Sequence, residues 1–143
     1  MEANVISLSP EYVVTTEQAE KLLKLQREIL EQVALGVDYG KILDALCKAA
    51  EQIVVDAVAS IMVYDETGTA LKVLAAPSVP VDAIAALNGL VPGEAAGSCG
   101  TAVYSNDAQY VVNTKTDGRW CDLQTLVQDF SIGACWSSPI KIE

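Results

Sequence analysis

The side chains of this sequence best suited to chemistry are four cysteines, Cys47, Cys99, Cys121 and Cys135. No two of them form a CxxC pair, and zinc sites built from cysteine alone use closely paired thiols. The chain contains no histidine, which is the commonest general base and the partner of Ser or Cys in catalytic triads. A domain of this size also needs no disulfide framework. The pattern therefore disfavours a metal site and ordinary hydrolytic catalysis.

A glycine-rich segment, GEAAGSCG at residues 93–100, surrounds the second of these cysteines. Glycines allow a backbone to approach a small ligand, and a helix that starts near Gly100 would present free N–H groups to it. A helix start would also lower the pKa of Cys99 and favour its thiolate. We expect a loop that covers a pocket, with Cys99 either reactive or packed as a small residue. Cys121, in a polar segment, has the same two alternatives.

The run GACWSSPI at residues 133–140 predicts a strand that opens near Ala134. Side chains alternate between the two faces of a strand, so only one of Cys135 and Trp136 can point into a pocket. Trp136 either stacks on a ligand or is buried with its N–H satisfied. Hydroxyl groups on both sides of this region either bind a small polar ligand or cap nearby backbone groups. They belong to Ser98, Thr101 and Ser137.

Composition sets the limits on function. The 143 residues are 51% apolar and 20% charged, which is typical of one globular domain with a buried core. Nine basic and nineteen acidic residues give a net charge of −10, which disfavours nucleic acids and anionic membranes as partners. No apolar run approaches the ~20 residues of a membrane span. Residues 1–10 lack the features of a secretory signal, so we expect a cytoplasmic domain without direct membrane insertion.

Two amphipathic helices are predicted at the start of the chain. Thr15 and Gln18 fit a capping box, and leucine, isoleucine and valine then recur at helical spacing as far as Gly36. Asp38 is placed to cap a second helix, whose apolar stripe includes Cys47. We therefore interpret Cys47 as a core residue.

Shorter elements follow these helices. Runs at 58–64 and 71–75, joined by the turn residues 65–69, predict an antiparallel hairpin. We expect further elements in the order helix, loop, short helix, strand, helix and strand, and this order favours an α+β domain. The ranges are 83–87 for the first helix, 93–100 for the loop, 101–104 for the short apolar segment, 110–112 for the first strand, 123–130 for the next helix and 134 onward for the last strand.

Together with the two N-terminal helices and the hairpin, three segments of the chain resemble a GAF domain, a small-molecule-sensing module of bacterial signalling proteins. They are residues 97–102, 117–120 and 134–140, and the resemblance covers roughly residues 20–143. It implies an antiparallel sheet of about six strands with helices on one face and a ligand pocket on the other. It also implies that this pocket is bordered by Gly97, Ser98, Cys99, Gly100, Thr101, Trp120, Cys135, Trp136 and Ser137.

The resemblance also implies domain boundaries. We expect an N-terminal extension at 1–15 and a single GAF domain at 16–143. Members of the family continue after SSPIKIE with a strand and a helix, so this domain looks truncated at its C-terminal end. Bilin-binding members attach their chromophore at a Cys followed by His, and this chain has no histidine.

The function implied is a non-catalytic, ligand-sensing domain of a larger protein, namely a histidine kinase, a response regulator or a cyclic-di-GMP enzyme. Its partners would be a small molecule of unknown identity and an output domain, and its cofactor, if any, is unknown. One alternative is an enzyme similar to free methionine-R-sulfoxide reductase that uses Cys99 and Cys121, although Gly89 stands where those enzymes carry a third cysteine. The other alternative is a ligand-free module that forms a homodimer through the N-terminal helix.

Overall fold

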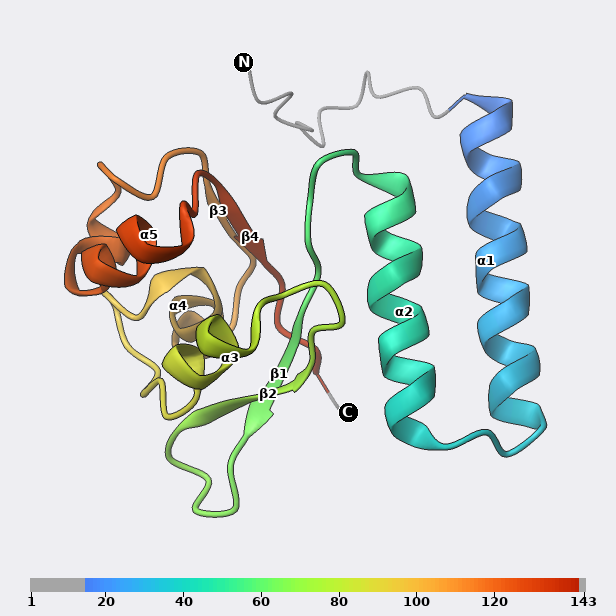
Figure 1. Ribbon diagram of the computed structural model, residues 1–143, viewed down its shortest axis with the longest axis horizontal. Coiled ribbons are helices and arrows are strands. Elements are labelled where there is room, and N and C mark those ends of the chain that lie inside the picture. Colours follow the sequence, from blue (N-terminus) through green and yellow to red (C-terminus); the bar gives the residue numbers. More distant parts are fainter. Residues whose placement is uncertain (1–14, 142–143) are drawn as a thin grey trace. The chain divides into compact units, whose positions relative to one another are not determined.

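The computed structural model describes residues 15–141, and over them the chain is an α+β protein (Figure 1). The described strands form two two-stranded sheets, β1 with β2 and β3 with β4. No described helix is both long and apolar enough to cross a membrane. The elements in chain order are α1 (Thr16–Ala34), α2 (Tyr39–Ile53), β1 (Ile61–Tyr64), β2 (Leu71–Ala75), α3 (Val81–Leu87), α4 (Gly97–Ser105), β3 (Gln109–Val111), the 3-10 helix η1 (Gly118–Leu123), α5 (Gln124–Phe130) and β4 (Cys135–Ser137).

The described residues divide into two compact units. Residues 15–61 and 73–80 form one, which we call the helical unit because it contains α1 and α2. Residues 62–72 and 81–141 form the other, which we call the mixed unit because it contains α3 to α5, η1 and the β3–β4 sheet. All of the residues predicted to border a pocket lie in the mixed unit.

The caps of the helical unit confirm the sequence prediction. The Thr15 hydroxyl accepts from the Gln18 backbone N–H, and the Gln18 side chain accepts from the Thr15 N–H, which completes the capping box of α1. Beyond its C-terminus, Gly36 takes a left-handed φ of 68° that suits glycine. The Asp38 carboxylate then accepts from the Lys41 N–H and starts α2.

Cys47 lies in the core of the helical unit, as its place on the α2 stripe predicted. Only 2% of it is exposed, and its thiol donates to the Ala75 carbonyl at 3.9 Å. Burial, and then the nearby carboxylates of Asp44 and Glu51, raise the pKa of this thiol. The residue is therefore a protonated core group.

The first hairpin is shorter than predicted, because β1 begins at Ile61 instead of residue 58. The Ala59 N–H donates to the Glu51 carboxylate at 2.9 Å, so this donor is engaged by a side chain of α2 and not by a strand. The tight turn at 65–69 is as predicted. Gly68 has a φ of 70° there, and its N–H donates to the Asp65 carbonyl.

The core of the mixed unit lies where α5, η1 and the β3–β4 sheet meet. Strands β3 and β4 are antiparallel, with Gln109 opposite Ser137, Tyr110 opposite Trp136 and Val111 opposite Cys135. The buried cluster consists of Val111, Trp120, Leu126 and Val127. The positions of α3, α5, β3 and β4 agree with the sequence prediction to within one or two residues.

Two expectations of the sequence have a different outcome, and a third concerns residues that the structure does not describe. The six-stranded sheet that the resemblance implies is not seen in residues 15–141, where the strands form two small sheets. The glycine-rich loop predicted at 93–100 is wrong in its second half, since Gly97 already opens α4. Residues 1–14 of the expected N-terminal extension lie outside the described residues.

Candidate functional site

The start of α4 owes its place to close packing against η1. Gly97 has a φ of 65°, which glycine adopts without strain, and a Cβ there would lie 3.1 Å from Leu123 Cδ1 and 3.4 Å from Trp120 Cζ2. A Cβ on Gly100 would meet Ala96 Cβ at 2.4 Å. Glycine is therefore required at these two positions because neighbouring parts of the chain pack closely there, and not because a loop must be flexible.

A relay of hydrogen bonds joins the three segments on which the family resemblance rests. The indole N–H of Trp120 donates to Ser98 Oγ at 3.1 Å, and the Ser98 hydroxyl donates to the Cys135 carbonyl at 3.0 Å. Ser98 is fully buried and Trp120 is 4% exposed. Trp120 lies in the 3-10 helix η1 and belongs to the core. We call these three groups the Ser98 relay.

Cys99 lies beside this relay and faces β4. Its Sγ is 3.0 Å from Ser137 Oγ. The prediction that a helix start lowers its pKa is wrong, because burial, followed by the charge of a neighbouring Cys135 thiolate, raises the pKa of Cys99 to about 11. One helical turn away from Ser98, the Thr101 hydroxyl donates to the Glu94 carbonyl at 3.3 Å, so it caps backbone.

The β4 strand presents different chemistry on its two faces, as its alternation predicted. Cys135 and Ser137 are partly buried toward α4, and Cys135 packs against the core cluster. Trp136 lies on the opposite face and keeps 38% of its surface exposed. Its ring meets that of Tyr110 edge to face, with centroids 6.4 Å apart and planes at 66°. Trp136 therefore does not share a face with the Ser98 relay.

Sequence reasoning missed a clamp that holds η1 against β3. The Arg119 guanidinium pairs with both oxygens of Asp117, at 2.8 Å from Nε and 2.6 Å from Nη2. It also donates to Gln109 Oε1 at 2.9 Å and to the Tyr110 carbonyl at 3.1 Å. The Arg119 hydrogen bonds hold the pKa of Asp117 down at about 2. The signal in the sequence was an Asp at a helix N-cap with an Arg two residues later.

The clamp fixes the residue next to it in the chain. Arg119 precedes Trp120, and its hydrogen bonds to Gln109 and Tyr110 tie η1 to β3, so they also set where the indole enters the core. Bidentate pairing of this kind restricts the guanidinium in both position and angle. Asp117 and Arg119 are therefore positioning residues for the Ser98 relay.

The structure gives the two cysteines of the reductase alternative different surroundings. Cys121 is exposed, and its thiol donates to the carboxylate of the adjacent Asp122 at 3.6 Å. Cys99 is partly buried and contacts Ser137. A pKa of about 11 leaves the Cys99 thiol protonated at neutral pH, which is unfavourable for a nucleophile.

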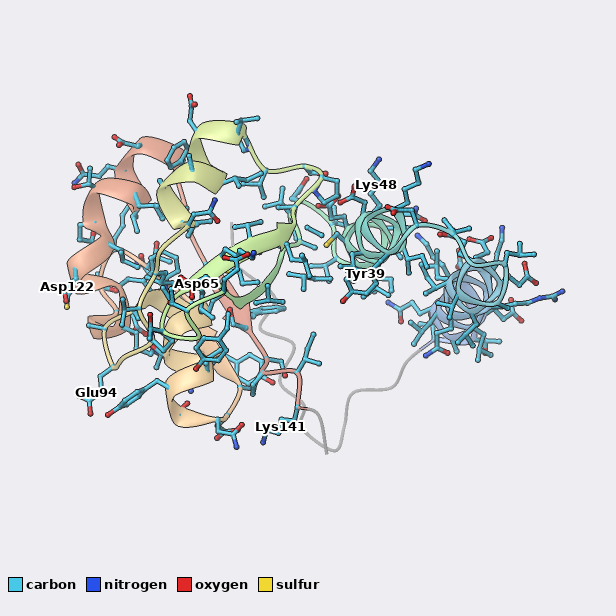
Figure 2. The ribbon with its side chains drawn as sticks, turned by 90° about the horizontal axis from the view of Figure 1, so that it is seen from below. Tyr39, Lys48, Asp65, Glu94, Asp122 and Lys141 are labelled. Atoms are coloured by element: carbon cyan, nitrogen blue, oxygen red, sulfur yellow. The ribbon has the colours of Figure 1, made fainter. Side chains whose placement is uncertain are left out.

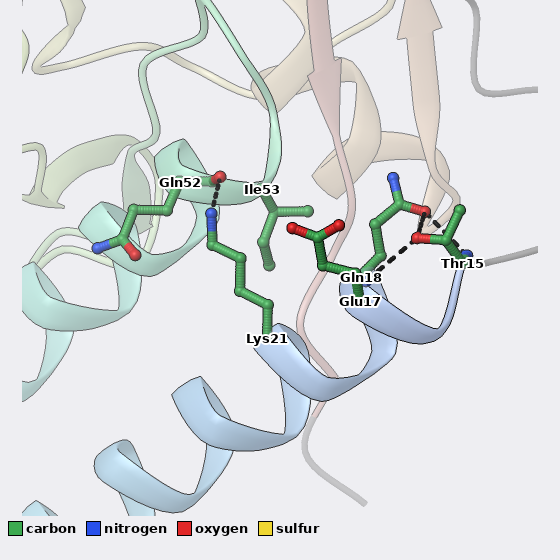
Figure 3. Close-up of a pocket in the computed structure, with 6 residues that line it drawn as sticks. All are labelled: Thr15, Glu17, Gln18, Lys21, Gln52 and Ile53. Atoms are coloured by element: carbon green, nitrogen blue, oxygen red, sulfur yellow. Dashed lines mark hydrogen bonds between the residues drawn. The ribbon is translucent and has the colours of Figure 1, made fainter.

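The hollows of the helical unit are bordered by other residues. One of about 310 Å³ lies between the start of α1 and the end of α2, where Lys21 Nζ donates to the Gln52 carbonyl at 2.8 Å (Figure 3). This contact places a cation at a helix C-terminus, which the helix dipole favours. A second hollow of about 200 Å³ lies farther along the same two helices. The first is lined by Thr15, Glu17, Gln18, Lys21, Gln52 and Ile53.

Within residues 15–141, no three side chains of His, Cys, Asp or Glu gather as a metal site requires. All four cysteines are free thiols. The candidate site is thus a set of neutral hydroxyl, thiol and indole groups that already satisfy one another. A ligand that accepts a hydrogen bond from Ser98 must therefore exchange it for the internal bond to the Cys135 carbonyl.

Comparison with known proteins gives one match to a sensor. The chain is 27% identical over 128 residues to a methyl sulfide methyltransferase-associated sensor of Methanosarcina acetivorans. The match covers 90% of this chain and 13% of that protein, so the chain spans a small part of its relative's length. No model of a protein family and no solved structure matches the chain.

Proposed function

We propose that this chain is a ligand-sensing GAF domain that regulates a larger signal-transduction protein and has no catalytic activity of its own. The observation that carries the proposal is the Ser98 relay. It draws one residue from each of three segments that lie far apart in the sequence, and these are the segments that resemble the family. The match to a much longer protein that is named a sensor supports the same function.

The proposed ligand would compete for the hydrogen bonds of the relay. The Ser98 hydroxyl uses its only proton on the Cys135 carbonyl and accepts from the Trp120 indole, so a ligand that accepts a hydrogen bond from Ser98 must displace Cys135, and a ligand that takes the place of the indole must displace Trp120. Release of Trp120 would loosen η1, and release of Cys135 would loosen β4. The ligand then favours one packing of these elements over another, which is the differential contact that a population shift requires. An output domain in the parent chain would respond to that packing.

A thermal-shift screen tests the proposal. The panel holds nitrate, nitrite, cyclic nucleotides, small carboxylates, heme and, because of the relative's name, dimethyl sulfide. A binder at one hundred times its Kd adds ~2.7 kcal/mol to the free energy of unfolding and raises Tm measurably. No stabilisation by any compound at high concentration would count against a sensor.

Two variants show whether a compound that stabilises the chain acts at the relay. Ser98→Ala removes the central hydroxyl, and the Tm rise caused by the compound should be lost. Ser105→Ala deletes an exposed hydroxyl on the same helix, and the rise should persist. A rise that survives equally in both variants would place the ligand elsewhere.

A second candidate function, dimerisation, is favoured by α1. No residue of α1 is buried, although the helix is strongly amphipathic. Leu23, Leu30 and Val33 are 65%, 67% and 55% exposed, and with Gln26 they follow the 3 and 4 spacing of a coiled-coil seam. We call these four residues the outer seam. A second copy of the chain would cover it by pairing α1 with α1.

The neighbouring helix presents a comparable division into faces. Tyr39 and Lys48 extend from opposite sides of α2, and Tyr39 is 65% exposed (Figure 2).

Sedimentation equilibrium over a range of concentrations tests dimerisation. We expect a dimer for the natural chain and for Lys24→Glu, a charge change on the polar side of α1, and a monomer for Leu30→Glu. A natural chain that stays monomeric at high concentration contradicts this candidate.

A further inference from the structure

Two thiols of the mixed unit lie near the hydroxyl of Ser137. Cys99 Sγ is 3.0 Å from Ser137 Oγ, and hydrogen bonding by Ser98 and Ser137 lowers the pKa of Cys135 against the larger effect of burial. Cys135 and Ser137 are two residues apart on β4, so their side chains share the face that meets α4. The backbones also approach each other here, since the Ser98 hydroxyl, one residue before Cys99, donates to the Cys135 carbonyl at 3.0 Å.

We propose that Cys99 and Cys135 form a reversible disulfide when a hydroperoxide oxidises the protein. A disulfide requires Cα atoms roughly 4.4–6.8 Å apart and side chains that converge. The Ser98 hydroxyl joins the first turn of α4 to the Cys135 carbonyl of β4, and the Cys99 thiol contacts Ser137, two residues from Cys135 on the same face of that strand. Rotation about a Cα–Cβ bond then exchanges the contact with Ser137 for a contact between the sulfurs. This inference does not depend on the proposed ligand.

The chemistry balances with a hydroperoxide as the oxidant. One thiolate attacks the O–O bond and becomes a sulfenic acid, and the peroxide leaves as water or an alcohol. The second thiol attacks the sulfenic sulfur, forms the S–S bond and expels water. With hydrogen peroxide, two thiols and one peroxide give one disulfide and two waters. Two electrons pass from the sulfurs to the peroxide oxygens.

The remaining thiols serve as internal references. Cys47 lies in the helical unit, is 2% exposed and bonds to a carbonyl. Cys121 is exposed and contacts Asp122. Neither has a second thiol at hand in the way that Cys99 and Cys135 do. If the distance between thiols decides which ones react, Cys99 and Cys135 become linked. If solvent exposure decides it, oxidation begins at Cys121.

The rate of linking should depend steeply on pH. Burial raises the pKa of both Cys99 and Cys135, so little thiolate is present at pH 7. Each pH unit below the thiol pKa changes the thiolate fraction about tenfold, and the rate should rise accordingly toward alkaline pH. The bond, once formed, would tie α4 to β4 and release the Ser137 hydroxyl.

Peptide mapping of the natural chain tests this proposal without any variant. The protein is treated with hydrogen peroxide, the peroxide is removed, and the chain is unfolded in urea so that every free thiol is alkylated. The chain is then digested and analysed by mass spectrometry without reduction. We expect a linked peptide pair that contains Cys99 and Cys135, lacks two hydrogens and separates with dithiothreitol. Cys47 should be recovered as an alkylated thiol.

Two variants complete the design. Cys121→Ala should leave the Cys99 to Cys135 link intact, and Cys99→Ser should abolish it and leave Cys135 open to alkylation. The linked natural chain should unfold at a Tm roughly 5 °C or more above the reduced chain. The proposal fails if both thiols are still alkylated after peroxide has oxidised Cys121. It also fails if Cys99 is found joined to Cys121, to Cys47 or to another chain.

Discussion

Replacement of Ser98 by alanine is the sharpest test of how the mixed unit is held together. The serine hydroxyl is fully buried, donates to the Cys135 carbonyl and accepts from the Trp120 indole. Each net hydrogen bond stabilises a protein by about 1 kcal/mol, and a buried donor left without a partner costs about 1–3 kcal/mol. Ser98→Ala loses the first bond and leaves the indole N–H unpaired. We expect a loss of ~2–4 kcal/mol in the free energy of unfolding.

Urea denaturation followed by tryptophan fluorescence measures this loss. Both tryptophans, Trp120 and Trp136, lie in the mixed unit, so the signal reports the unit that contains the substitution. With a slope of about 1–3 kcal/mol/M, the midpoint should fall by ~1–2 M. Ser105→Ala is the matched control, because it removes a hydroxyl from an exposed position of the same helix. Its cost should stay below ~0.5 kcal/mol.

A double-mutant cycle isolates the indole bond from the rest of the effect. Trp120→Phe removes the N–H donor and keeps an aromatic ring, while Trp136 remains as the fluorescent reporter. In that background Ser98→Ala no longer strands a buried donor, so it should cost ~1–2 kcal/mol less than in the natural chain. The reasoning is refuted if Ser98→Ala costs no more than Ser105→Ala, or if the cost is unchanged by Trp120→Phe.

Two further predictions concern the surroundings of the relay. Because Arg119 holds the pKa of Asp117 down at about 2, below the ordinary 3.8, Asp117 contributes stability above pH 4 that is lost as the pH falls toward 2. Asp117→Asn should therefore destabilise the protein at pH 7. The difference in unfolding free energy between this variant and the natural chain should shrink as the pH falls toward 2. A difference that does not depend on pH would contradict the clamp. Gly100→Ala should cost ~1–3 kcal/mol, because its Cβ would meet Ala96 Cβ at 2.4 Å, whereas Gly118→Ala, with open space at its Cβ, should be near neutral in the same urea titration.

The helices were predictable because their signals are local. The hydroxyl of Thr15 and the carboxylate of Asp38 stand one residue before the helices that they cap, and the apolar stripe of α2 repeats every three or four residues. A short segment of chain contains all of this information. The first strand was harder, because its start depends on Glu51, which takes the Ala59 N–H from eight residues away.

The proximity of three of the predicted site residues was predictable, but their arrangement was not. The sequence placed Ser98, Trp120 and Cys135 near one another through the family resemblance, and the structure joins them directly. The sequence could not show that the Trp120 indole donates its hydrogen bond to the Ser98 hydroxyl. The glycines around them were ambiguous for the same reason, since a glycine that permits a flexible loop and one that permits close packing look identical in sequence.

The pKa of Cys99 shows why the local argument failed there. The start of a helix stabilises a negative charge by ~0.3–1 kcal/mol, less than the ~1.4 kcal/mol that corresponds to one pKa unit. Burial can raise a pKa by up to about 3–5 units, so it dominates wherever the side chain turns inward. In α4 the thiol turns inward against β4, and burial raises its pKa to about 11 although the hydrogen bond with Ser137 acts in the other direction. Only the tertiary contact between a helix and a strand 36 residues later decides that direction, and the same contact that suppresses the thiolate brings Cys135 within reach.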